Sequence, residues 1–234
     1  MEVAMKARDV MSRDVPTVRP ETPVVDAARL LLTHRIGAVP VIDADGRLAG
    51  LVSEADLLHR AETGTLHERS WWLRAITPGE VLAREYVKTH ARQIRDVMSL
   101  DVVCVTEDAE LASVVDLMET RGAWTIPVVR DNQPVGLINR ATLLQLLVSR
   151  ASSTAPVQND DAAIRQRVVD AFRTEPWAGL WSSNVIVHDG VVHLWGWAGS
   201  EAVRDACRVA AESVPDVKGV ENHIHVPRLI SLSM

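Results

Sequence analysis

A short sequence pattern occurs twice in this chain of 234 residues, and this duplication constrains the fold more than any other feature. The matched segments are Arg8-Asp9-Val10-Met11-Ser12 with 95–99, Pro40-Val41 with 127–128, Gly50-Leu51 with 136–137, Ala55 with Ala141, and Leu57-Leu58 with 143–144. The early matches are 87 positions apart and the later ones 86, which indicates a one-residue deletion in a hairpin turn. A repeat of this kind predicts one supersecondary unit used twice, with two pseudo-symmetric faces that pack together.

Composition narrows the class of protein. The formal net charge of −6 argues against a broad nucleic-acid surface, which needs clustered Lys and Arg. Cys104 and Cys207 are the two cysteines, too few for a disulfide framework, and they favour a reducing compartment. The N-terminal residues carry no apolar secretory segment, and no apolar run reaches the length of a membrane span. We therefore expect a cytoplasmic protein that binds no nucleic acid.

Both copies show the same order of predicted elements, β-α-β-β-α. In the first copy the elements are a strand at 15–18, a helix with Thr22 as N-cap and Pro23 as first residue, strands at 39–42 and 48–52, and a helix at 54–60. In the second copy they are a strand near 102–105, a helix at 110–120, strands at 126–129 and 135–138, and a helix at 140–148. The predicted fold class is α+β.

This order, with Asp-Val-Met-Ser at the front and Gly-Leu-Val-Ser-x-x-Asp at the back, resembles the cystathionine-β-synthase (CBS) domain. The resemblance covers residues 6–60 (repeat 1) and 94–150 (repeat 2), and two such domains in tandem resemble a Bateman module. It implies that the repeats pack as a disc, that the disc forms a homodimer, and that clefts between repeats bind AMP, ATP, NAD or S-adenosylmethionine. Such a ligand would be regulatory, and no cofactor would be required.

The segment Ser53-Glu54-Ala55-Asp56 has two interpretations. Ser53 can cap a helix while an acid three residues later accepts from the Ser53 amide. The resemblance also implies that Ser53 and Asp56 contact the ligand, with Asp56 on the ribose hydroxyls. The two roles are compatible. The ligand-binding residues expected for this first site are Thr17, Ile36, Gly37, Ala38, Pro40, Ser53 and Asp56, with Lys6, His34 and Arg35 as candidate phosphate contacts.

The second repeat departs from the pattern. Its equivalent segment has Asn139 and Thr142, and Thr142 cannot supply a carboxylate. Trp124 replaces the small Gly37, so its indole could stack on a base or fill the pocket. We expect a second, weaker site formed by Trp124, Ile126, Pro127, Asn139 and Thr142.

Two connecting segments lie outside the repeats. Residues 61–93 form an insertion with Trp71-Trp72 and a predicted helix at 81–93, and we expect the tryptophans to be buried on this chain or in a dimer contact. The insertion also carries basic residues, so weak binding to an anionic surface remains an alternative role. Residues 151–159 form a polar linker.

The C-terminal part has the order α-β-β-α-β. Asp160-Asp161 is expected to cap the first helix, His188-Asp189-Gly190 to form the hairpin turn, and Ser200 to open the second helix. With Gly190-Val191-Val192-His193-Leu194-Trp195-Gly196, residues 160–228 resemble the BON domain. The resemblance implies binding to phospholipid membranes or other macromolecules, and no catalytic residues.

Strand alternation adds a prediction about the faces of this sheet. Val192, Leu194, Ile224 and Val226 should face the helices, which turns His193, Trp195, Trp197, His223 and His225 to the other face. We expect that face to be an interaction surface, docked on the CBS disc or a second subunit, or presented to a partner or lipid. A metal site from His193, His223 and His225 is the least favoured interpretation because no acidic or Cys ligand joins them, so no metal is expected.

The sequence favours a regulatory protein that binds an adenine-containing ligand between CBS repeats and signals through the BON domain or a separate partner. The alternative is a CBS dimerisation scaffold with empty clefts that presents the BON domain to a macromolecule or phospholipid surface. An enzyme is not expected, because the chain has no P-loop, dinucleotide glycine fingerprint or Ser-His-Asp context.

Overall fold

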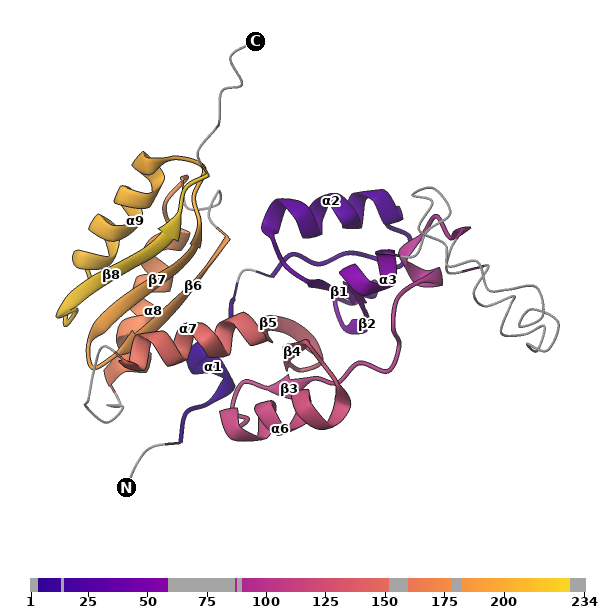
Figure 1. Cartoon of the computed structure of the whole chain (residues 1–234), viewed down its shortest axis with the longest axis horizontal. Coiled ribbons are helices and arrows are strands. Elements are labelled where there is room, and N and C mark those ends of the chain that lie inside the picture. Colours follow the sequence, from indigo (N-terminus) through magenta and orange to yellow (C-terminus); the bar gives the residue numbers. More distant parts are fainter. Residues whose placement is uncertain are drawn as a thin grey trace, which may run out of the picture. The chain divides into compact units, whose positions relative to one another are not determined.

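The computed structural model describes residues 4–13, 15–58, 87, 90–151, 160–177 and 182–227. It divides into two compact units, which Figure 1 shows with their elements labelled. We call residues 15–103 and 129–134 the first-repeat unit, and residues 1–14, 104–128 and 135–234 the second-repeat unit. No helix within the described ranges has the length and apolarity needed to cross a membrane.

The first-repeat unit is built on a two-stranded antiparallel hairpin. Its elements are α2 (Val24–His34), β1 (Ala38–Ile42), β2 (Leu48–Ser53), α3 (Glu54–Leu58) and the short 3-10 helix η2 (Ile94–Asp96). The buried side chains at helical spacing on α2, which are Val24, Ala27 and Leu31, pack with the alternating strand residues Val39, Val41 and Val52.

Two local predictions for the first repeat are wrong. The helix begins at Val24 after Pro23, and Thr22 does not cap it: the Thr22 hydroxyl accepts instead from the Arg19 amide at 3.0 Å. The expected strand at 15–18 is reduced to one parallel bridge from Val18 to Val41. Pro16 has no amide hydrogen for a ladder, so pairing begins only beyond it.

The equivalent elements of the second repeat lie in the second-repeat unit, except that residues 129–134 of its hairpin are assigned to the first-repeat unit. They are α1 (Ala7–Val10), β3 (Val105–Thr106), α6 (Leu111–Arg121), β4 (Thr125–Arg130), β5 (Gln133–Asn139) and α7 (Arg140–Ala151). Strand β4 lies between β3 and β5 in the sheet. The expected strand near 102–105 is shorter and begins later, at Val105.

The two copies of the Arg-Asp-Val-Met-Ser segment are exchanged between the repeats. Ser12 pairs with Leu137 of the second repeat, and Ser99 pairs with Leu51 of the first. Consistent with this, Ala7 donates its amide to the Ala109 carbonyl at 2.8 Å. Each repeat is therefore completed by the segment that precedes the other one in the sequence.

Glycines make this exchange possible. A Cβ added to Gly136 would lie 2.5 Å from Met11 Sδ, and one added to Gly50 would lie 2.9 Å from Met98 Sδ. The sequence repeat carries both the glycine and the methionine, so the same close approach occurs twice.

The C-terminal part of the second-repeat unit is a three-stranded sheet with two helices. Its elements are α8 (Asp160–Arg173), β6 (Ser182–His188), β7 (Val191–Trp197), α9 (Glu201–Glu212) and β8 (Gly219–His225). Strand β7 is central, antiparallel to β6 and parallel to β8. Val192, Leu194 and Ile224 lie in the core with both helices, as strand alternation predicts, and Ser200 caps α9 through the Val203 amide.

Asp161 has a different role from the one expected. Its carboxylate does not cap α8 but accepts from the backbone amides of Asp189 and Gly190 at 2.9 and 2.8 Å. These two residues form the β6–β7 turn and both have positive φ. A side chain near the start of the helix thus holds the hairpin turn in place.

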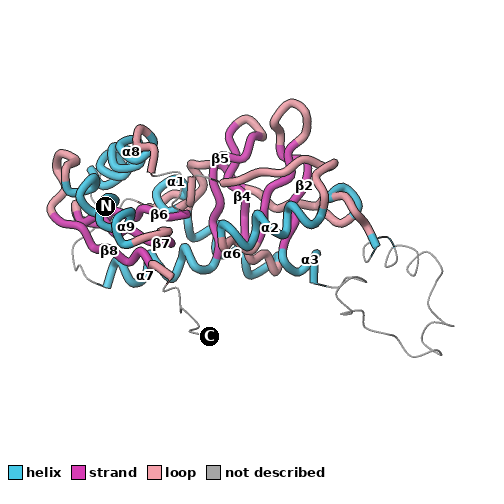
Figure 2. The backbone as a smooth tube through the Cα atoms, turned by 90° about the horizontal axis from the view of Figure 1, so that it is seen from above, coloured by secondary structure: helices cyan, strands magenta, loops and turns pink. Residues whose placement is uncertain are grey.

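The other face of this sheet packs on the CBS part of the same unit. Ile186 belongs to the buried cluster that contains Met11 and Leu146, and Trp195 packs against this cluster. Asn184 donates to the Val10 carbonyl at 2.9 Å and to Gln145 Oε1 at 3.2 Å. Figure 2 shows α1, α7 and β6 in the same region of the unit.

Arg165 of α8 joins the two parts. Its guanidinium donates to the Val185 carbonyl at 2.6 Å, to the Arg8 carbonyl at 3.0 Å and to the Met11 carbonyl at 2.6 Å. Burial lowers the pKa of Arg165 to about 9, so the group remains charged at neutral pH. A buried charge that reaches three carbonyls fixes α8 and β6 against the N-terminal segment.

Candidate functional site

Ser53 and Asp56 meet at the junction of β2 and α3. One carboxylate oxygen, Asp56 Oδ2, accepts from both the Ser53 amide at 2.9 Å and the Ser53 hydroxyl at 2.7 Å. The other oxygen, Oδ1, takes neither bond, and both residues are half-buried. The pair therefore forms the acidic half of a capping box while keeping one carboxylate oxygen for another donor.

The hairpin brings other expected site residues beside this pair. Ala38 is opposite Ser53 in the β1–β2 register, and the Gly37 carbonyl accepts from the Glu54 amide at 3.0 Å. Space is open where a Cβ on Gly37 would lie. Pro40 is buried and its carbonyl accepts from the Val18 amide at 3.1 Å, next to the half-buried Thr17. Ile36, also half-buried, packs against the core of the first repeat.

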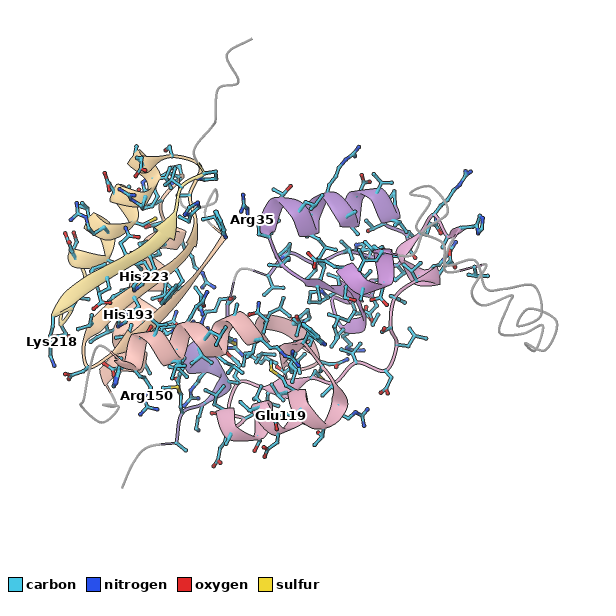
Figure 3. All side chains as sticks on the ribbon, viewed as in Figure 1. Arg35, Glu119, Arg150, His193, Lys218 and His223 are labelled. Carbon is cyan, nitrogen blue, oxygen red and sulfur yellow. The ribbon has the colours of Figure 1, made fainter. Side chains whose placement is uncertain are left out.

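The candidate phosphate contacts differ in position. His34 is the last residue of α2, and Arg35 follows it, two residues before Gly37. Figure 3 labels Arg35 at this end of α2. Arg35 has φ 51° and ψ 44°, the left-handed conformation, whereas the repeat has Gly122 at the equivalent C-cap. Lys6 belongs to the second-repeat unit, where its ammonium contacts Asp108 at 3.1 Å and holds the pKa of that carboxyl below its usual value.

The equivalent junction in the second repeat is closed. Asn139 Oδ1 accepts from the Thr142 amide at 2.9 Å and from the Thr142 hydroxyl at 3.2 Å. Thr142 is only 2% exposed, and Ile126 and Pro127 are buried as well. This junction offers neither a carboxylate nor an exposed hydroxyl.

Trp124 lies at the surface of the second repeat, next to Arg140. Its side chain is 69% exposed, and the Arg140 guanidinium lies over the indole at 4.1 Å from the ring centroid. The indole does not fill a pocket in its own repeat. It forms instead a cation–π pair with the first residue of α7.

The histidines and tryptophans of the C-terminal sheet share one face. Trp195 stacks on His223 with centroids 4.0 Å apart, and Trp197 meets His225 edge-on at 4.4 Å. His193 is 1% exposed, and burial lowers its pKa against the opposing effect of Glu221. Figure 3 shows His193 and His223 on adjacent strands of this sheet.

The expectation that no acidic residue joins these histidines is wrong. Glu221 lies opposite His193 in the parallel β7–β8 register, and its Oε2 is 3.3 Å from His193 Nδ1 and 3.4 Å from His223 Nε2. The period of two that places His223 and His225 on this face also places Glu221 there. The signal was therefore present in the sequence.

Some expected residues lie outside the described part of the chain, and one buried residue with a structural role was not expected. Trp71-Trp72, the linker 152–159 and most of the predicted helix at 81–93 lie outside the described residues. Sequence reasoning missed Arg165, although it occupies the same helical stripe as Ile164 and Val168. An arginine on an apolar stripe was the signal available.

Comparison with known families agrees with this architecture. Residues 7–62 and 94–149 each match the CBS domain, and residues 160–228 match the BON domain. The chain is a tandem CBS pair followed by a BON domain.

Individual relatives match the CBS pair. The chain is 25% identical over 146 residues to inosine-5'-monophosphate dehydrogenase from Methanocaldococcus jannaschii, covering 62% of this chain and 24% of that protein. It is 31% identical over 142 residues to the chloroplastic CBS domain-containing protein CBSX1 from Arabidopsis thaliana, covering 56% and 58%. The chain thus spans less than two thirds of the length of either relative.

A solved structure shows the same relationship. The structure of CBSX2 in complex with AMP superimposes with a TM-score of 0.53 at 25% identity, covering 62% of this chain and 97% of that one. CBSX2 is a CBS-pair protein from Arabidopsis thaliana.

Proposed function

We propose that this protein is a non-catalytic regulator whose first CBS repeat binds an adenine nucleotide of the AMP class. The observation that carries the proposal is the arrangement of Asp56: one oxygen is fixed by Ser53, and the other is left to accept from a ligand. A carboxylate oxygen held in this way can accept from ribose hydroxyls without first losing a local bond.

The neighbouring backbone supports the same ligand. Gly37 has open space where another residue would carry a Cβ, and it is positioned against α3 by its carbonyl. Because glycine has no Cβ, a planar base can approach its backbone more closely than it can approach the backbone of any other residue. The similarity to CBSX2, which was solved in complex with AMP, supports an adenine nucleotide as the ligand.

Arg35 supports a phosphate on the ligand. A non-glycine residue in the left-handed conformation costs roughly 1–2 kcal/mol, and the second repeat has glycine at the same place. Strained positions of this kind are concentrated at functional sites. We propose that Arg35 is kept there because its guanidinium binds the phosphate of the nucleotide.

The second repeat does not share this role in our proposal. Asn139 and Thr142 satisfy each other, and Thr142 is buried. The proposal is therefore one strong nucleotide site per chain.

Replacing Asp56 by asparagine should remove about half or more of the stabilisation by AMP, because tenfold weaker binding leaves only about 1.4 kcal/mol at the same ligand concentration. AMP at about a hundred times its Kd should stabilise the wild-type protein by about 2.7 kcal/mol, or about 5–10 °C in Tm for a chain of this length. Asparagine can still accept from Ser53 through its one oxygen, but it presents an amide NH2 in place of the second acceptor. Thermal unfolding with AMP, ATP, NAD and S-adenosylmethionine measures the effect.

Asp26→Asn is the matched control, because Asp26 is an exposed carboxylate on α2 that pairs with Arg29. It should keep the full response to AMP. If the wild-type Tm responds to none of the four ligands, or Asp56→Asn responds normally, the nucleotide site is refuted and the scaffold with empty clefts is favoured.

Arg35→Gly should raise the stability of the ligand-free protein and at the same time weaken its binding of AMP. Removing the left-handed strain should stabilise the ligand-free protein by about 0.5–1 kcal/mol after the entropy cost of glycine. Loss of a charged hydrogen bond should weaken AMP binding about tenfold or more. Adenosine, which has no phosphate, should bind both proteins equally in a calorimetric titration, and equal AMP affinity would remove Arg35 from the site.

The output of the regulator is also part of the proposal. We propose that the CBS pair forms a homodimer and that ligand binding changes how the BON domain is presented to an effector protein or a membrane surface. A ligand can shift such an equilibrium only by its differential affinity for the two arrangements. An AMP-dependent change in capture of liposomes or of a partner by the full chain would support this output.

A further inference from the structure

Three side chains with metal-binding atoms converge on the face of the BON sheet that carries the histidines. His193 comes from the central strand β7, and Glu221 and His223 come from the parallel strand β8. The atoms His193 Nδ1, one Glu221 carboxylate oxygen and His223 Nε2 all lie within 4.8 Å of one another.

Two of the three spacings among these atoms match a tetrahedral metal site. Glu221 Oε2 is 3.3 Å from His193 Nδ1 and 3.4 Å from His223 Nε2. Ligand bonds of about 2.0–2.2 Å in a tetrahedron place neighbouring donor atoms about 3.3–3.6 Å apart. The third pair, His193 Nδ1 and His223 Nε2, lies within 4.8 Å, so a modest movement of the side chains would complete the site.

Hydrogen bonding does not account for the convergence. His193 Nδ1 and His223 Nε2 are both inaccessible to solvent and neither has a hydrogen-bond partner. His193 is 99% buried, given its 1% exposure, so its unpaired nitrogen calls for an explanation. Both nitrogens lie within 3.4 Å of the Glu221 carboxylate without a hydrogen bond to it, and an ion between the three groups would satisfy all of them.

We propose that His193, Glu221 and His223 bind a divalent transition-metal ion, with zinc as the expected species. Two imidazoles and one carboxylate suit zinc and its neighbours, whereas calcium and magnesium prefer oxygen ligands alone. The three protein ligands leave a fourth position for water or an external donor. Glu221 is 41% exposed and His223 29%, so two of the three ligand side chains reach the protein surface.

Trp195 supports one of the three ligand side chains. Trp195 stacks on the His223 ring with an interplanar angle of 15°, and Trp195 packs against the second-repeat core. Metal binding would therefore fix a ring that belongs to the contact between the BON and CBS parts.

The test uses the untagged full chain after removal of metals. Co²⁺ should give the strong visible absorption of a four-coordinate site, and Zn²⁺ should displace it stoichiometrically. Glu221→Gln and His223→Gln should each weaken Zn²⁺ binding by more than about a hundredfold, since losing even an outer partner of a ligand costs 10–100-fold. Ni²⁺ or Cu²⁺ should quench part of the tryptophan fluorescence in the wild type, because Trp195 stacks on His223, and should quench less of it in Glu221→Gln.

His225→Gln is the matched control, because His225 lies on the same face and strand but outside the triad. It should bind Zn²⁺ as the wild type does. Urea unfolding without metal verifies that each variant is folded. Absence of a Co²⁺ band in the wild type, or Zn²⁺ binding that Glu221→Gln leaves unchanged, would overturn the proposal.

Discussion

Replacing Arg165 by methionine should lower the free energy of unfolding of the full chain by about 2–4 kcal/mol, because hydrogen bonds from a charged group are worth about 1.5–3 kcal/mol each. The guanidinium donates to the carbonyl of Val185 in β6 and to the carbonyls of Arg8 and Met11 in the N-terminal segment. Methionine fills a similar volume but leaves these buried acceptors without their donor.

The expected loss is smaller than the sum of three bonds. Burial of the guanidinium is itself unfavourable, as its lowered pKa shows, and methionine removes that cost. Lysine should restore only part of the stability, because one ammonium cannot reach three carbonyls in the planar geometry of a guanidinium.

Urea unfolding measures this effect, with Arg167→Met as the matched control. Arg167 is on the same helix but exposed, where it pairs with Asp216, so its loss should change stability by less than about 0.5 kcal/mol. If Arg165→Met unfolds like the wild type, Arg165 does not join the BON part to the N-terminal segment.

Gly136→Ala should destabilise the protein by about 1–3 kcal/mol, the usual cost of overpacking a core. The new methyl would lie 2.5 Å from Met11 Sδ and 3.0 Å from the Ser12 carbonyl oxygen. Methionine can move, but the backbone oxygen is held by the pairing of Ser12 with Leu137. The strand and the N-terminal segment would have to separate.

The repeat provides an internal comparison for this prediction. Gly50→Ala should cost a similar amount, because its Cβ would lie 3.0 Å from the Ser99 carbonyl oxygen. Gly199→Ala, where a Cβ meets nothing within 4 Å, should be close to neutral. Normal stability of both Gly50→Ala and Gly136→Ala would show that the two segments are not exchanged.

The order of helices and strands in the CBS repeats was predictable because the same sequence pattern occurs in both. The copies confirm each other at the hairpins, where Pro40-Val41 and Gly50-Leu51 recur, and strand alternation places Val192 and Leu194 in the BON core. The exchange of the two Asp-Val-Met-Ser segments was not predictable. Periodicity reports which face a residue buries, not which of two equivalent partners it buries against.

At the candidate site, too, local contacts were predictable from the sequence and long-range contacts were not. The capping geometry of Ser53 and Asp56 follows from local spacing, and the structure has it. Long-range polar contacts, such as Asp161 with the β6–β7 turn, depend on packing that spacing does not encode. Glu221 is an intermediate case. Strand alternation predicts the face of the sheet on which Glu221 lies, but its closeness to two histidines depends on the parallel β7–β8 register.

A calorimetric titration of AMP into the wild-type chain and into Asp56→Asn tests the central claim most directly. The proposal predicts saturable binding by the wild type with a stoichiometry of about one per chain, and binding at least about tenfold weaker once the second carboxylate oxygen is lost. No heat of binding in the wild type, or equal affinity in the variant, would contradict it.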